Sequence, residues 1–69
     1  MVGSELRERR RAAGLTQEEV ARLLAVAPNT VARWESGNRR ITERAARQLR
    51  MLLAFVEGNA AWAELLWVR

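Results

Sequence analysis

The 69-residue sequence contains no cysteine, histidine, lysine, aspartate or tyrosine. Without cysteine the chain forms no disulfide, and without cysteine and histidine it lacks the usual zinc ligands. The missing side chains also perform most acid–base and nucleophilic catalysis in enzymes. We therefore expect neither an enzyme nor a metal or cofactor site.

Long apolar segments are missing as well. The sequence has no run of about 18 apolar residues, which a membrane-spanning helix requires. Its first residues are charged where a signal peptide would be apolar. These absences predict a cytoplasmic protein that does not associate with a membrane.

Residues that break helices are scarce. Proline occurs once and glycine four times, and 49% of the residues are hydrophobic, too many for a disordered chain. Alanine, leucine, arginine and glutamate, all good helix formers, dominate. We predict an all-α fold, a compact bundle of about five short helices. A chain this short buries only about 60% of the surface that its unfolded form exposes.

The charged residues are of two kinds only. All 12 cations are arginine and all eight anions are glutamate, so the net charge is +4. A basic surface attracts polyanions such as nucleic acid, although charge alone is a weak signal. Arginine-rich and alanine-rich usage is also typical of GC-rich prokaryotic or phage genomes.

Turn and capping residues divide the first part of the chain. Ser4 is a candidate N-cap for a first helix that ends near residue 13, before Gly14. Thr16 and Glu19 have the spacing of a capping box, which predicts a second helix from residue 17. Its apolar residues at core spacing are Val20, Ala21, Leu23 and Leu24.

Two further helices follow. Pro28 suits the first turn of a third helix that ends at Gly37, and Thr42 is expected to cap a fourth. The third helix has a narrow apolar stripe, Val31 and Trp34, and a broad polar outer face. The fourth buries one face, formed by Ala45, Ala46, Leu49, Leu52, Leu53 and Val56.

The second and third helices, joined by a tight turn, have the helix-turn-helix arrangement. The motif reads QEEVARLL over residues 17–24 and PNTVARWESG over residues 28–37. Over about residues 4–56 the chain resembles the Cro/C1-type (XRE family) helix-turn-helix proteins, which implies a lambda-repressor-like fold that binds DNA. Ala25 stands where that family usually has a turn glycine. If this position needs a positive φ, alanine costs about 1 kcal/mol there.

The resemblance implies base contacts by Asn29, Thr30 and Arg33, and a structural ion pair between Arg10 and Glu35. Base chemistry agrees independently, because arginine pairs with guanine and asparagine with adenine. On the sequence alone, Asn29 and Arg33 could also be ordinary solvated residues. The phosphate contacts implied by the resemblance are Gln17, Asn38, Arg39, Arg40 and Arg44.

Within the last segment, residues 58–69, the stretch from Ala60 to Val68 is apolar on nearly every side. We predict that residues 1–57 form the DNA-binding domain and that residues 58–69 are a dimerisation segment packed on it. The expected dimer interface consists of Phe55, Trp62, Leu65, Leu66 and Trp67. Two alternatives stay open: both tryptophans of the segment complete the core, or the segment forms a strand that pairs across a two-fold axis.

Together these features predict a sequence-specific, nucleoid-associated transcriptional regulator, most simply a repressor. It would bind double-stranded DNA at a palindromic operator as a homodimer, through the major groove. We expect no cofactor and no small-molecule effector. The alternative is an antitoxin-like or other protein-interaction module whose apolar C-terminal tail binds a partner protein.

Overall fold

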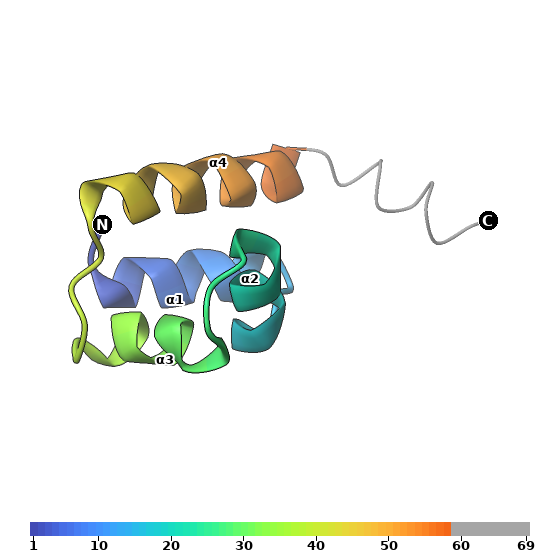
Figure 1. Cartoon of the computed structure of the whole chain (residues 1–69). Coiled ribbons are helices and arrows are strands. Elements are labelled where there is room, and N and C mark those ends of the chain that lie inside the picture. Colours follow the sequence, from blue (N-terminus) through green and yellow to red (C-terminus); the bar gives the residue numbers. More distant parts are fainter. Residues whose placement is uncertain (59–69) are drawn as a thin grey trace.

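The computed structural model describes residues 1–58, which form four helices and no strand (Figure 1). The helices are α1 (Gly3–Ala12), α2 (Gln17–Leu24), α3 (Pro28–Ser36) and α4 (Glu43–Gly58). The all-α prediction is therefore confirmed. The fifth predicted element, after residue 58, lies outside the described residues. None of the helices in the described part is long and apolar enough to cross a membrane.

Helix α1 begins earlier than predicted. Val2, not Ser4, is the N-cap residue, and the amide of Leu6 already donates to the carbonyl of Val2 at 3.1 Å. The reason is tertiary: the backbone of Gly3 lies so close to the carbonyl oxygens of Trp34 and Glu35 that a Cβ there would collide with them. Packing against the end of α3, rather than a capping side chain, sets the start of α1.

Local signals set the starts of the other three helices as predicted. The capping box at the start of α2 is complete, because the Glu19 amide donates to Thr16 Oγ1 at 3.0 Å and the Thr16 amide donates to Glu19 Oε1 at 2.8 Å. Pro28 occupies the first turn of α3. Thr42 caps α4 by accepting a hydrogen bond from the Ala45 amide at 3.1 Å.

The turn between α2 and α3 has a strained residue. Ala25 has φ 58° and ψ 43°, the left-handed conformation, and is the one non-glycine residue with positive φ in the described part. The corresponding residues after α1 and α3 are glycines, Gly14 at φ 75° and Gly37 at φ 85°. Position 25 therefore does need a positive φ, and alanine occupies a position that glycine would occupy without strain.

One apolar core joins the four helices. Its buried members are Leu6, Val20, Ala21, Val31, Trp34, Ala46, Leu49 and Leu53. The prediction that Leu23 belongs to the core is wrong, because its side chain is 58% exposed. Ala21 and Leu24 place the buried side of α2 on the other flank of Val20, so Leu23 points to solvent.

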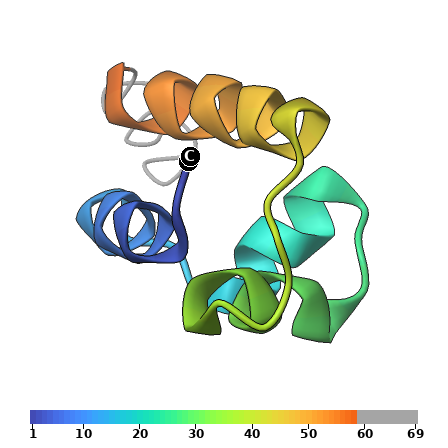
Figure 2. The same ribbon diagram turned by 90° about the vertical axis from the view of Figure 1, so that its left-hand side faces the viewer.

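The helices pack so that α3 is held from two sides. Helix α2 packs most extensively on α3, and α1 contacts both α3 and α4. Figure 2 shows α1 and α2 on opposite sides of the domain, with α4 crossing above them and α3 below. The outer side of α3 is therefore left uncovered by the other three helices.

Candidate nucleic-acid interface

Helix α3 has one buried side and one exposed side. Val31 and Trp34 are buried in the core, and Glu35 is buried beside them. Asn29 and Arg33, one helical turn apart, are exposed on the other side. Among the described residues, the Arg33 guanidinium lies within 4 Å of no carboxylate. The inner side of α3 is therefore packed in the core, while its exposed side presents an amide and a guanidinium to solvent.

Thr30 differs from its neighbours. It is only 7% exposed and lies on the side of α3 that packs against the rest of the domain. The implied base contact by Thr30 does not agree with this position, because the side chain does not project with Asn29 and Arg33. Thr30 lies about 100° around the helix from Asn29, on the side of Val31 and Trp34, which turns its side chain inward.

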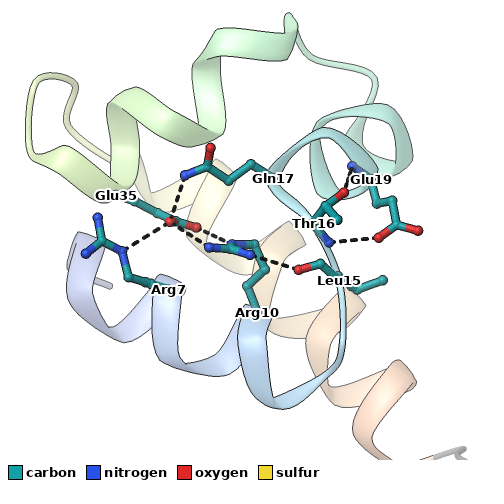
Figure 3. Close-up of polar contacts among 7 residues, drawn as sticks. All are labelled: Arg7, Arg10, Leu15, Thr16, Gln17, Glu19 and Glu35. Atoms are coloured by element: carbon teal, nitrogen blue, oxygen red, sulfur yellow. Dashed lines mark hydrogen bonds and ion pairs between the residues drawn. The ribbon is translucent and has the colours of Figure 1, made fainter.

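Glu35 binds residues from both preceding helices (Figure 3). Its Oε2 accepts from Arg10 Nε at 2.6 Å, and its Oε1 accepts from Arg10 Nη2 at 3.1 Å, which is a bidentate ion pair. Oε1 also accepts from Gln17 Nε2 at 3.0 Å and from Arg7 Nε at 3.4 Å. One carboxylate on α3 thus binds α1 and the first residue of α2.

Both ends of this ion pair are shielded from water. The Glu35 side chain is 0% exposed and that of Arg10 is 10% exposed. Arg10 Nη1 also donates to the carbonyl of Leu15 at 2.9 Å, so the guanidinium is bonded in three directions. Such a pair is strongly destabilising to break, because the remaining charge would be buried without a partner.

The electrostatics of the two bonded carboxylates follow from their contacts. Burial raises the pKa of Glu35, but the hydrogen bonds from Arg10, Gln17 and Arg7 more than offset it, so the pKa lies below its ordinary value of 4.5. The backbone amide and then the hydroxyl of Thr16 lower the pKa of Glu19. Both groups are therefore ionised in the folded protein at neutral pH.

The contact between Gln17 and Glu35 bears on the implied phosphate role of Gln17. The amide nitrogen that would donate to a phosphate already donates one hydrogen to Glu35. An amide has two hydrogens, so one remains for a second acceptor. Gln17 is thus half-buried at the start of α2, and its hydrogen bond to Glu35 fixes the orientation of its side chain.

The loop after α3 brings three of the implied phosphate contacts together. Asn38, Arg39 and Arg40 are all exposed, and Arg44 follows in the first turn of α4. The Arg39 amide donates to the carbonyl of Arg33 at 3.2 Å, which folds the loop back on the end of α3. None of these arginines is within 4 Å of a carboxylate in the described part of the chain.

Two ion pairs were not anticipated from the sequence. Arg7 joins Arg10 at Glu35, and Arg9 pairs with Glu57 at 3.5 Å, which connects α1 to the end of α4. A spacing of three residues between Arg7 and Arg10 puts both on one side of α1 and could have indicated the first contact. The second depends on how α4 crosses α1, for which the sequence has no local signal.

Other kinds of site find no support within residues 1–58. No group of three or more acidic, histidine or cysteine side chains there could hold a metal ion. Phe55, predicted for the dimer interface, is 52% exposed on α4. The other predicted interface residues, Trp62, Leu65, Leu66 and Trp67, lie outside the described residues.

Helices α2 and α3, joined at Ala25 and fixed through Glu35, define a helix-turn-helix unit with an uncovered second helix. The chain matches the family described as "Helix-turn-helix domain" over residues 2–62. It therefore belongs to that family, within the Cro/C1-type group, and this membership indicates a DNA-binding regulator. No significant match occurs among curated proteins or among solved structures.

Proposed function

We propose that this chain is a sequence-specific transcriptional regulator that binds double-stranded DNA with α3 in the major groove. The exposed pair Asn29 and Arg33 carries the proposal. These side chains are one turn apart on a helix of nine residues, and their types pair with adenine and guanine edges. A repressor that acts by covering promoter DNA needs no further domain or effector.

The contacts to the DNA backbone that position α3 come from the surrounding arginines and amide side chains. Asn38, Arg39 and Arg40 in the loop, with Arg44 in α4, contact phosphates beside the groove. Gln17 contributes its remaining amide hydrogen from the start of α2. These contacts carry no sequence information, whereas Asn29 and Arg33 select the bases.

A single copy would bind weakly, because a net charge of +4 supports only several phosphate contacts. The proposal therefore includes a cytoplasmic homodimer on a palindromic operator, with the two α3 helices about 34 Å apart in successive major grooves. Residues 1–57 serve as the DNA-binding domain and residues 58–69 as the dimerisation segment, together with Phe55.

Selection of bound sequences from random DNA, followed by three alanine variants, tests the proposal. Arg33→Ala should weaken binding by about 1–3 kcal/mol and relax the preference at one base position. Arg39→Ala should weaken binding to all sequences and reduce the slope of log K against log salt by about 0.9. Arg50→Ala, which removes the same charge from an exposed position on α4, is the control and should change affinity least.

Several results would contradict the proposal. If selection enriches no palindromic sequence, the proposed palindromic operator is wrong. If Arg33→Ala and Arg50→Ala lose the same DNA affinity, the proposed base contact by α3 is wrong. Analytical ultracentrifugation of the chain distinguishes the antitoxin-like alternative from the homodimer. A monomer at all concentrations would favour a partner protein for residues 58–69 over a second copy.

A further inference from the structure

Arg7, on α1, contacts the buried carboxylate of Glu35 but is itself half exposed. Its Nε donates to Glu35 Oε1 at 3.4 Å, and its side chain is 47% exposed. Within residues 1–58 this is the one hydrogen bond that the Arg7 side chain makes. A guanidinium has five N–H groups, so those on the two terminal nitrogens remain available. Arg7 therefore offers solvent the fork of donors that binds phosphate oxygens in pairs.

The charges around Glu35 do not balance. Arg10 forms the bidentate pair with this carboxylate, and both side chains are shielded from water. These two opposite charges already cancel, so Arg7 adds a positive charge that the fold does not need for neutrality. No other carboxylate in the described part of the chain lies within 4 Å of Arg7. The junction of α1, α2 and α3 thus has an excess positive charge beside solvent.

Gln17 donates to the same oxygen as Arg7. Its Nε2 lies 3.0 Å from Glu35 Oε1, to which Arg7 Nε donates at 3.4 Å. The two donor nitrogens are therefore no farther apart than these two distances together. Figure 3 shows the two side chains reaching Glu35 from α1 and from the start of α2. Gln17 keeps one free amide hydrogen, as Arg7 keeps its terminal nitrogens. A single anion is thus within reach of both side chains.

We propose that Arg7 is a further contact to the DNA backbone and that it binds the same phosphate as Gln17. This inference rests on the function proposed above, in which Gln17 contacts a phosphate, and it adds the cation that shares that phosphate. Glu35 sets the spacing of the two donors, because its Oε1 accepts from both. Arg7 supplies the positive charge and Gln17 supplies a neutral hydrogen bond, so α1 takes part in DNA binding.

The salt dependence of DNA binding tests the charge. Arg7→Met removes the guanidinium but keeps an apolar stem, and Arg7→Lys keeps the charge. In the full chain, bound to its selected DNA site, Arg7→Met should reduce the slope of log K against log salt by about 0.9. Arg7→Lys should retain the slope of the wild type, as should the control Arg50→Ala. Urea titration of each variant establishes that it is folded under the binding conditions.

Neutral methylphosphonates identify the phosphate. Each phosphate of the selected site is replaced in turn, and affinity is measured for the wild type, Arg7→Met and Gln17→Ala. Neutralising a phosphate that accepts a charged hydrogen bond should cost the wild type about tenfold in affinity. At one and the same phosphate position, the loss should be smaller for Arg7→Met and for Gln17→Ala than for the wild type.

Each other result decides against a stated part. If Arg7→Met leaves the slope unchanged while Arg39→Ala reduces it, Arg7 only supports Glu35; the inference is then wrong and the proposed function stands. An equal reduction for Arg7→Lys would likewise exclude a role for the charge. Smaller losses at two different phosphates would exclude the shared site. If the wild-type chain selects no DNA, the proposed function fails and this inference fails with it.

Discussion

Replacing Ala25 with glycine should stabilise the domain. Ala25 is held at φ 58° in the turn between α2 and α3, where an L-residue with a Cβ is strained by about 1–2 kcal/mol. Glycine removes that strain but gives the unfolded chain more freedom, which opposes folding by about 0.4–1 kcal/mol. Ala25 is exposed, so the change loses little buried surface. The net gain is about 0.5–1 kcal/mol.

Thermal unfolding followed by circular dichroism measures the effect. For a domain of this size, 1 kcal/mol corresponds to about 4–8 °C, so Ala25→Gly should raise Tm by about 2–8 °C. The backbone amide of Ala25 donates to the carbonyls of Ala21 and Arg22, and glycine retains both bonds. The helical content of the variant should therefore be unchanged.

Two matched variants control for the substitution itself. Ala54→Gly places the same change at an exposed helical position and should destabilise by about 1 kcal/mol. Gly14→Ala is the reverse change at φ 75°, where a Cβ would meet no atom within 4 Å, so it should lower stability through conformation alone. If Ala25→Gly lowered Tm as Ala54→Gly does, the strain assigned to Ala25 would be refuted.

Four further outcomes are expected. Glu35→Gln should lower the free energy of unfolding, measured by urea titration, by about 3 kcal/mol or more, because it leaves Arg10 buried without a charge partner. Replacing both Arg10 and Glu35 with methionine should restore part of that loss. The folded pKa of Glu35 lies below 4.5, so the unfolded chain binds its proton first and stability should fall as pH drops below that value, with no step between about pH 5 and 8. Thr16→Ala should cost about 1 kcal/mol and Ser4→Ala almost nothing, and equal losses would restore Ser4 as a cap. Gly3→Ala should cost about 1–3 kcal/mol, since its Cβ would lie 2.8 Å from the Glu35 carbonyl oxygen, and an unchanged Tm would contradict that close approach.

The features that were predictable from the sequence are those that depend on a few neighbouring residues. A capping threonine, a proline in a first turn and a glycine after a last turn each act within one turn of backbone, so α2, α3 and the start of α4 were predictable. The start of α1 was not, because it depends on the contact of Gly3 with carbonyls about 30 residues away. No local pattern around Ser4 contains that contact.

The exposure of single residues shows the same limit. Apolar periodicity identifies residues that share a helix face, but the neighbours decide where the buried face is centred. Leu23 and Thr30 lie at the edges of their helix faces. Leu23 was predicted to be buried but is exposed, and Thr30 was predicted to be exposed but is buried. Arg10 and Glu35 were paired through the family resemblance, whereas Arg7 and Gln17 join them only because three helices meet at one carboxylate.

The two sides of α3 have a consequence for how the protein can change. Every residue of α3 that supports the fold through burial lies on its inner side, and the exposed Asn29 and Arg33 contribute no buried contact. Substitutions at exposed positions of this kind usually alter stability by no more than about 0.5 kcal/mol. DNA preference could therefore be rewritten at Asn29 and Arg33 while the scaffold stays the same, so a set of regulators with different operators could share one core.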